Sequence, residues 1–250
     1  MDYVQRINQL AKLIRSAKRT VAFTGAGIST ESGIPDFRSK GSGLWEKIDP
    51  MAILSIRALK RSPQRFYQDG FVHFLNLESA KPNPAHEVIG WLEQKKFLAG
   101  VITQNIDGLH QKAGSRRVLE VHGHLRTGHC MRCKKKYKML NIRHLLDLGK
   151  IPPMCSCGGL LRPDVTLFGD PMPRDFWSAT AEVEQSDFLL VVGSSLTVSP
   201  ANSLASIAKQ VAIINLETTS FDRQADLVIQ EKAGKVLLDL KLVLEREEKN

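Results

Sequence analysis

The chain has 250 residues, of which 42% are hydrophobic, so one large domain, or a core domain with insertions, can bury a sizeable core without disulfides. No run of apolar residues is long enough to span a bilayer, which argues against a membrane protein. The net charge of +9 makes nucleic acid a candidate partner through a basic surface. Such a surface is equally typical of proteins that bind no polyanion, and we predict no nucleic-acid contact from it.

The N-terminal segment is predicted to be the first helix of the fold, because its apolar residues recur on one helical face. It lacks the continuous hydrophobic region of a signal peptide, and a strand that starts at Thr20 leaves no spacer for cleavage of a transit peptide. We therefore expect a cytoplasmic protein. The residues of the apolar face are Val4, Ile7, Leu10, Ala11 and Ile14.

Short apolar runs rich in β-branched residues predict strands that are buried on both faces of a parallel sheet. Helical patterns at Ala85–Lys96 and Leu204–Lys209 lie between some of them, and this alternation indicates an α/β fold with helices on both faces of the sheet. Ligands of such sheets bind at the carboxyl ends of the strands, so the polar turns that follow them should meet in one crevice. The predicted strands are Thr20–Thr24, Gly100–Thr103, Phe188–Val192, Val211–Asn215 and, more weakly, Leu227–Ile229.

Two stretches interrupt the alternation and are predicted to form a smaller domain beside the sheet. The first, Asp36–Pro84, has helical patterns at Pro50–Lys60 and Pro63–Leu77, and the second, His122–Pro163, carries all the cysteines. We assign residues 1–36, 85–121 and 164–250 to the large domain, and residues 37–84 and 122–163 to the small one. The charged segment Glu245–Asn250 is expected to fray.

The turn after the first predicted strand contains Gly25-Ala26-Gly27. Small residues let a backbone approach a pyrophosphate, and amides of the turn can donate to it, but a tight turn without a ligand is the alternative. The acidic residue that a dehydrogenase fingerprint places about twenty positions later is missing, because the chain leaves the sheet through Asp36. Phe37 and Arg38 would then lie in a loop over the pocket, or else be an ordinary core anchor and a surface charge.

After the second predicted strand come Gln104, Asn105 and Asp107, whose side chains are costly to bury without partners and should line a polar cavity. A helix N-cap at Asp107 is the alternative, and it explains only that residue. His122 follows an apolar segment and precedes a glycine. A lone histidine is more often structural than catalytic, but a position between the polar crevice and the cysteine cluster favours a catalytic role.

The turns after the two strongest C-terminal strands also carry polar groups. Gly193-Ser194-Ser195 offers hydroxyls and amides that suit phosphate or ribose, and Asn215 and Glu217 offer acceptors for ribose hydroxyls. Ordinary turn chemistry is the alternative for each of them.

The four cysteines predict a zinc site. Cys130 and Cys133 are separated by two residues, 21 residues follow, and Cys155 and Cys157 are separated by one. Four thiolates close the tetrahedral shell of Zn²⁺ and leave no position for water, so one structural ion is predicted. A redox pair and a nucleic-acid-binding ribbon are the alternatives. The basic residues around the first pair suit a ribbon, but Tyr137 is the only aromatic residue among them.

Taken together, these segments resemble the sirtuin family of NAD-dependent protein deacylases, and the resemblance covers nearly the whole chain. One departure is the second cysteine pair, which is C-x-C where C-x2-C is more usual. The resemblance implies a Rossmann-like large domain and a small zinc domain, with NAD and acyl-lysine meeting in the cleft between them. Besides the cysteines, the motifs are GAGISTESGIPDFR from Gly25, TQNIDGLH from Thr103, EVHG from Glu120, FGD from Phe168, GSSL from Gly193 and INLE from Ile214.

The resemblance also implies a role for each matching residue. His122 would be the general base, with Asn105 beside it in the catalytic site, Asp107 would hold the nicotinamide carboxamide, and Phe37 would shield the ribose. The implied contacts to substrate peptide are Val165, Phe168 and Gly169, and the implied zinc ligands are Cys130, Cys133, Cys155 and Cys157. The implied NAD contacts are Gly25, Ala26, Gly27, Thr30, Asp36, Phe37, Arg38, Gln104, Asn105, Asp107, Gly193, Ser194, Ser195, Asn215 and Glu217.

The implied reaction removes an acyl group from a protein lysine and releases nicotinamide and 2′-O-acyl-ADP-ribose. An NAD-dependent ADP-ribosyltransferase would use the same pocket, and a zinc-ribbon nucleic-acid binder would explain the charge and the cysteines but not the QNID and DFR segments. Family members that prefer acidic acyl groups share a Tyr-x-x-Arg pair. Tyr67 matches its tyrosine but Gly70 replaces the arginine, so neutral acyl groups are predicted unless Arg61 or Arg65 reaches the pocket.

Overall fold

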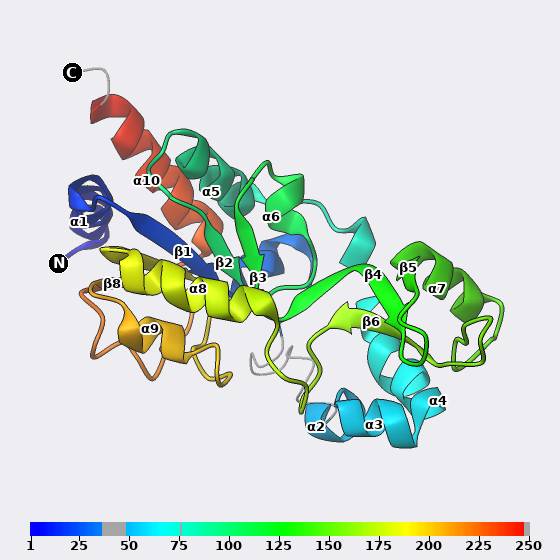
Figure 1. The fold of residues 1–250 in the computed structure, drawn as a ribbon. Helices are drawn as coiled ribbons and strands as arrows, with labels where there is room; N and C mark the ends of the chain where they lie inside the picture. Colours follow the sequence, from blue (N-terminus) through cyan, green and yellow to red (C-terminus); the bar gives the residue numbers. More distant parts are fainter. Residues whose placement is uncertain (37–48, 76, 248–250) are drawn as a thin grey trace.

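The larger part of the molecule is a six-stranded parallel sheet, and a smaller part lies beside it (Figure 1). The computed structural model describes residues 1–36, 49–75 and 77–247. None of the helices in this described part of the chain is long and apolar enough to cross a membrane.

The order of the strands in the large sheet is β3-β2-β1-β7-β8-β9, and every neighbouring pair is parallel. Counted along the chain, this is the order 3-2-1-4-5-6 of dinucleotide-binding folds, in which the winding of the chain reverses between the two central strands. Those strands here are β1 and β7. The bounds are β1 Thr20–Thr24, β2 Val101–Thr103, β3 Val118–Glu120, β7 Phe188–Val192, β8 Val211–Ile214 and β9 Leu227–Ile229.

Helices cover both faces of this sheet, as the alternating pattern predicted (Figure 1). On one face, α1 (Tyr3–Ser16), α5 (Pro84–Gln94) and α10 (Ala233–Glu247) share a core that includes Ala22 of β1. On the other, α8 (Arg174–Gln185) and α9 (Ser203–Ile207) pack on Val21 and Phe23 of the same strand. Successive side chains of a strand point to opposite faces, and so one buried strand supplies both cores.

The first and last helices pack against each other. The hydroxyl of Tyr3 in α1 donates to Asp239 in α10 over 2.7 Å, and both helices belong to one apolar core. The expectation that Glu245–Asn250 frays was wrong up to residue 247, because α10 continues that far. Leu240 and Leu244 are fully buried and hold its last turns on the core. Residues 248–250 lie outside the described residues.

The smaller part is built from both interruptions of the α/β alternation. An antiparallel sheet of β4 (Gly123–Cys130), β5 (Lys136–Lys138) and β6 (Leu161–Val165) has the order β5-β4-β6. The helix α7 (Met139–Asp147) lies between β5 and β6 in the chain. The helical segment of residues 50–79 packs on it, since Phe66 and Phe71 share a core with Ile142 and Leu161. Its elements are α2 Pro50–Ile53, α3 Ile56–Arg61, α4 Pro63–Arg65, a π-helical turn at Phe66–Gly70 and 3-10 turns at Phe71–Phe74 and Leu77–Ser79.

The predicted helix at Pro50–Lys60 is divided at Ser55, which is a correction to the sequence interpretation. Ser55 has an extended backbone, and its side chain accepts a hydrogen bond from the amide of Ala58 as the N-cap of α3. On either side, the Phe168 amide donates to the Leu54 carbonyl and the Ile56 amide donates to the Phe168 carbonyl. These contacts with a distant segment interrupt the helix and fix residues 54–56 beside the loop that follows β6.

Candidate active site

The loops that follow β1 and β7 pack against each other where the winding of the sheet reverses. The Gly27 amide donates to the Gly193 carbonyl over 2.8 Å, and the Gly25 amide donates to the Val192 carbonyl. A Cβ on Gly193, whose φ is +62°, would lie 2.2 Å from the Ile28 nitrogen, and one on Gly27 would lie 2.8 Å from the Gly193 oxygen. We expected Gly25 and Gly27 to let the backbone approach a ligand, and the close approach that Gly27 makes in the structure is to Gly193 of the other loop.

A cavity of about 480 Å³ opens at this switch point, within the usual size of small-molecule sites. The turns after β1, β2, β3, β7, β8 and β9 line it from one side and the smaller part lines it from the other. Gly25 packs behind the lining, and Phe37 and Arg38 lie outside the described residues. The predicted residues that line the cavity are Ala26, Gly27, Thr30, Asp36, Gln104, Asn105, Asp107, His122, Val165, Phe168, Gly169, Gly193, Ser194, Ser195, Asn215 and Glu217.

Ser29 links the amide and the carboxylate that follow β2. Its hydroxyl donates to Asp107 over 2.8 Å and accepts from the Asn105 side chain over 3.1 Å. The second oxygen of Asp107 accepts from the amide of Leu109, the first residue of α6 (Leu109–Lys112), although the N-cap position of this helix is Gly108. Burial raises the pKa of this carboxyl. Sequence reasoning missed the role of Ser29, although the residue lies in the motif that begins at Gly25.

Two buried histidines lie behind this network. His86 of α5 and His110 of α6 have ring centroids 5.0 Å apart, and His86 lies 3.5 Å from the Ser29 hydroxyl. The Thr24 hydroxyl donates to Thr103 and can therefore accept from the Nε2 proton of His110 over 2.8 Å. Burial lowers the pKa of His86 to about 4 and that of His110 to about 3, so both rings are neutral at pH 7.

The side chain of Gln104 presents an unused donor to the cavity. Its oxygen accepts from the Ser194 hydroxyl over 2.9 Å, whereas its buried Nε2 has no hydrogen-bond partner among the described residues. Buried polar groups are almost always paired, so this one calls for an acceptor from a bound molecule. The hydroxyl, amide and phosphate oxygens of a dinucleotide provide such acceptors, and the lining therefore fits NAD.

His122, two residues after the end of β3, is held in one tautomer. Its Nδ1 lies 3.0 Å from the Gln104 carbonyl oxygen, and because a carbonyl can only accept, Nδ1 carries the proton. The other nitrogen, Nε2, then has a free lone pair when the ring is neutral. Burial lowers the pKa of His122 below its usual value of 6.5, with the hydrogen bond to Gln104 acting in the opposite direction. The ring is therefore a neutral base at pH 7 in a cavity rich in polar groups.

The smaller part contributes an apolar wall to the cavity. The residues that form this wall are not the ones that the sequence suggested for the acyl pocket. Phe71, Phe74 and Leu77 line the cavity. Tyr67 does not, because its hydroxyl donates to the Leu161 carbonyl in the core of the smaller part. A Cβ on Gly70 would lie 2.4 Å from the Ile53 side chain, and Gly70 is not among the residues that line the cavity.

The sequence analysis left open whether Arg61 or Arg65 reaches the acyl pocket, and neither residue lines the cavity. Arg61 and Arg65 line a separate groove on the outside of α3 and α4, and Arg65 pairs with Asp69 over 3.2 Å. Among the described residues, the cavity itself contains carboxylates and one lysine, Lys232, at the end next to α10.

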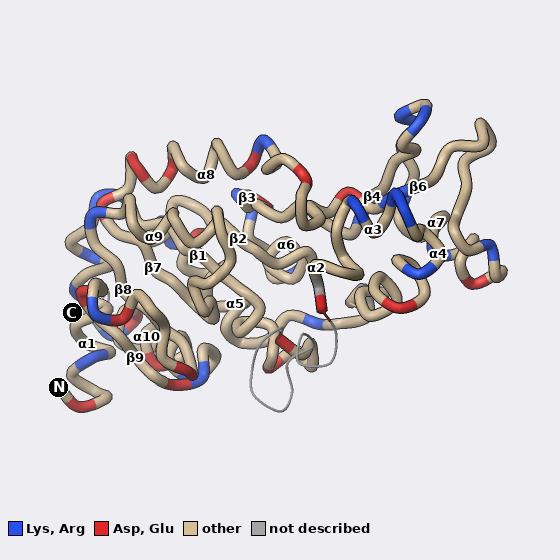
Figure 2. Tube along the Cα trace, turned by 90° about the horizontal axis from the view of Figure 1, so that it is seen from below, with Lys and Arg blue, Asp and Glu red and all other residues tan. Residues whose placement is uncertain are grey.

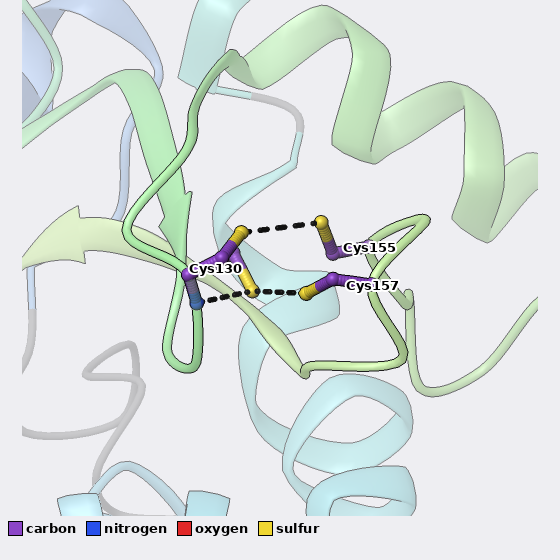
Figure 3. Close-up of side chains that lie close together, drawn as sticks. Cys130, Cys155 and Cys157 are labelled. Carbon is purple, nitrogen blue, oxygen red and sulfur yellow. Dashed lines mark hydrogen bonds between the residues drawn. The ribbon is translucent and has the colours of Figure 1, made fainter.

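The four cysteines meet in a compact cluster at the far end of the smaller part. Figure 3 shows the sulfurs of Cys130, Cys155 and Cys157 pointing toward one another. All four sulfurs lie within 4.8 Å of one another, with 3.5 Å between Cys130 and Cys157 and 3.7 Å between Cys133 and Cys155. Tetrahedral Zn²⁺ with bonds of about 2.3 Å places sulfurs about 3.8 Å apart. The free thiols therefore fit one zinc ion.

None of these cysteines lines the cavity, so a zinc ion bound here would be structural. The ligands come from the end of β4 and the turn after it, and from the loop that precedes β6. A Cβ on Gly159 would lie 2.6 Å from the Cys130 sulfur, which explains why a glycine follows the second pair. With the C-x-C spacing, both thiols of the second pair lie close to those of the first pair.

A parallel sheet of this order, a polar cavity at its switch point and a closed thiolate centre define a dinucleotide-binding α/β protein with a structural metal module. Comparison with known proteins narrows this class. The family model described as Sir2 family matches residues 25–200. The chain belongs to the Sir2 family.

Named relatives and solved structures agree with this assignment. The chain is 50% identical over 241 residues to NAD-dependent protein deacetylase 2 of Caldanaerobacter subterraneus subsp. tengcongensis, with 96% of each chain covered. It is 43% identical over 236 residues to NAD-dependent protein deacylase 2 of Pyrobaculum aerophilum, covering 91% of this chain and 92% of the relative.

Among solved structures, a Sir2 variant with a deacetylated p53 peptide and 3′-O-acetyl-ADP-ribose superimposes with a TM-score of 0.91 at 34% identity, covering 95% of this chain and 98% of that one. A complex of Sir2 with a p53 peptide and NAD⁺ gives a TM-score of 0.84 at 34% identity, with 98% and 99% covered.

Proposed function

We propose that this chain is an NAD-dependent protein-lysine deacylase that acts on acetyl-lysine. The observation that carries the proposal is the neutral His122, whose Nδ1 donates to the Gln104 carbonyl and whose Nε2 has no hydrogen-bond partner among the described residues, in the cavity at the switch point of a dinucleotide-binding sheet. Relatives that cover nearly the whole chain are named as NAD-dependent protein deacetylases and deacylases.

The polar end of the cavity would hold NAD, which supplies a ribose carbon that an acyl oxygen can attack as nicotinamide leaves. Gln104 would donate its unused Nε2 proton to the bound dinucleotide. Asp107, held by Ser29 and the Leu109 amide, would accept from a carboxamide NH₂. Ser194, Asn215 and the neighbouring turns would bind the adenosine side.

His122 would act on the second half of the reaction. Its Nε2 would take a proton from a ribose hydroxyl, so that this oxygen can attack the carbon of the transferred acyl group. With one water consumed, acyl-lysine and NAD would give free lysine, nicotinamide and 2′-O-acyl-ADP-ribose. Asn105 lies next to this position and is held by the Gly25 carbonyl and the Ser29 hydroxyl, so we assign it a role in orienting the reacting groups.

The substrate peptide is proposed to cross the loop that joins β6 to α8, where Val165, Phe168 and Gly169 line the cavity. Both backbone hydrogen-bonding groups of Phe168 are already bonded to Leu54 and Ile56. A peptide strand would therefore use backbone groups on either side of Phe168, while the residue itself fixes the edge of the loop.

One assay tests the proposal directly. Nicotinamide release from NAD is measured with and without an acetyl-lysine peptide, and the products are identified by mass spectrometry. We expect release that depends on the peptide, together with acetyl-ADP-ribose. ADP-ribose attached to protein would instead identify an ADP-ribosyltransferase, and no release with any acetylated peptide would overturn the assignment.

We also propose a cytoplasmic location. Four free thiols gathered as a metal site are typical of a reducing compartment, where disulfides do not persist.

A further inference from the structure

A groove of about 540 Å³ lies on the outer side of α3 and α4, next to the cavity but separate from it. Its charged lining consists of Arg57, Arg61 and Arg65, with Ser55 and Ile56 at its inner end. Figure 2 shows lysine and arginine positions gathered on α3 and α4. We call this feature the arginine groove.

The arginine groove carries positive charge that the described residues do not neutralise. No Asp or Glu is among the described residues that line it. Arg57 and Arg61 are exposed, and neither forms an ion pair within the described part of the chain, whereas Arg65 is held by Asp69. Arg57 and Arg61 are four positions apart on α3, so their side chains lie on one side of the helix, about 6 Å apart along its axis.

The arginine groove is continuous with the proposed peptide site. Phe168 and Gly169 line both the cavity and the groove. The hydrogen bonds between Phe168 and residues 54–56 fix the start of α3 against this loop, so the groove keeps its position relative to the cavity. A peptide whose acyl-lysine enters the cavity across Phe168 and Gly169 would continue on one side along α3.

We propose that the arginine groove binds acidic residues on one side of the substrate acyl-lysine, so that the preferred substrates are proteins with Asp or Glu there. This inference rests on the proposed deacylase function. Because Phe168 and Gly169 line both the cavity and the groove, we expect the acidic residues to lie close to the acyl-lysine in the peptide sequence. Guanidinium groups bind carboxylates with paired hydrogen bonds, which makes an arginine pair suited to this chemistry.

The test compares three labelled peptides that share one acetyl-lysine core. One has two Glu residues on the N-terminal side, the second has them on the C-terminal side, and the third has Gln at all four positions. Dissociation constants are measured by fluorescence anisotropy, and turnover is measured separately by nicotinamide release. One acidic peptide should bind about 5-fold more tightly than the Gln peptide at low ionic strength, since exposed ion pairs are individually weak. The difference should shrink in about 0.5 M NaCl.

Two variants assign the effect to the groove. Arg57→Gln/Arg61→Gln should bring the ratio of the two dissociation constants close to one. Arg116→Gln/Arg223→Gln removes the same charge from two exposed arginines outside the groove and should keep the ratio of the unmodified protein. Melting temperatures check that both variants fold.

Binding and turnover separate this inference from the function on which it rests. Equal binding of acidic and Gln peptides by the unmodified protein would overturn the groove proposal, even if the acetyl group is removed. A ratio that survives the groove variant would overturn it too. A third outcome is that the protein binds duplex DNA, that Arg57→Gln/Arg61→Gln abolishes this binding, and that the three peptides bind equally. That outcome would overturn the peptide proposal and identify the groove as a nucleic-acid surface. Absence of turnover would overturn the deacylase assignment, while the binding ratio would still decide the groove.

Discussion

His122 is the residue on which the proposed chemistry depends most. His122→Ala should lower the deacylation rate by at least about 100-fold, because a general base is lost from a step that has no other described base in position. NAD binding and the melting temperature should change little, since the ring contributes one hydrogen bond to Gln104. Rates of acetyl-ADP-ribose formation, with NAD affinity from calorimetry, check this. Near wild-type turnover would show that another group takes the proton.

The pH dependence of the same residue follows from its burial. The pKa of His122 is lowered below 6.5, and the neutral ring is the active form. Activity should therefore be constant as pH falls to neutrality and should be lost only as pH passes through a value below 6.5. A profile of kcat/KM against pH measures this midpoint. A midpoint above 6.5 would mean that the hydrogen bond to Gln104 outweighs the effect of burial on the pKa, and it would contradict this prediction.

The preference among acyl groups is also set by single side chains. Phe71, Phe74 and Leu77 offer no cation to an acidic acyl group, and Asp107 and Asp170 are among the carboxylates that line the same cavity. Burying a carboxylate without a partner costs several kcal/mol. We therefore expect kcat/KM for an acetyl-lysine peptide to exceed that for the succinyl peptide by at least about 100-fold. Faster turnover of the succinyl peptide would point to a cation outside the described residues, and Arg38→Gln would then test that residue.

At the scale of elements, the zinc module joins the turn after β4 to the loop before β6, which are also linked by hydrogen bonds from Met131 to Leu160 and from Arg132 to Cys157. The turn after β4 and the loop before β6 meet through their thiols, so the metal links the two. Removing the ion, or Cys155→Ala, should lower the melting temperature by several degrees, since structural zinc contributes directly to folding free energy. Elemental analysis should give one zinc per chain. Ser156→Ala, in the same loop, is the matched control and should melt like the unmodified protein.

The buried histidine pair makes α5 and α6 sensitive to acid. His86 and His110 have pKa values of about 4 and about 3 in the folded protein, against about 6.5 in an unfolded chain. As pH falls from 7 to 5, the unfolded chain takes up protons that the folded one does not, and stability is lost. The loss is on the order of 1–2 kcal/mol for each histidine.

Melting temperatures measured between pH 5 and pH 8 test this sensitivity. His86→Gln should reduce the decrease that the unmodified protein shows on acidification. His73→Gln removes an exposed histidine and should leave the decrease unchanged. An equal decrease in all three proteins would exclude the buried pair as its cause.

Elements with a strong local pattern were predictable from the sequence, and the others depended on distant contacts. The strands β1, β7 and β8 are continuous apolar runs, and their positions agree with the predictions to within one residue. β3 was not predicted as a strand, because it has three residues and lies at the edge of the sheet. The division of the helix at Ser55 is caused by Phe168, which lies more than one hundred positions away, and no local pattern reports that contact.

The candidate site shows the same limit. The polar residues that follow the strands could be named, because carboxyl ends of parallel strands share one edge. The apolar wall at Phe71, Phe74 and Leu77 could not, because these residues lie in short 3-10 turns that follow a π-helical turn, and no single helical period predicts their directions. Tyr67 and Gly70, which the sequence suggested for the acyl pocket, are not among the residues that line the cavity.

The whole molecule builds its cavity from segments spread along nearly the entire chain. The lining begins at Ala26 and ends at Ala233, and the Gly234 amide at the start of α10 donates to Glu31 in the first turn over 2.8 Å. The two interruptions of the sheet close the other side. A cavity of this kind is assembled only when the large sheet, the smaller part and the last helix are all in place.

The packing of α1 on α10 has a consequence for synthesis. Ile7, Leu10 and Ile14 are buried in a core that α10 completes. On a ribosome, these side chains emerge well before α10, which follows α1 by more than 200 positions. Until α10 emerges, the growing polypeptide therefore carries an uncovered apolar stripe, which is the kind of surface that chaperones bind. The stripe can close only after Ala233–Glu247 has been synthesised and has folded onto it.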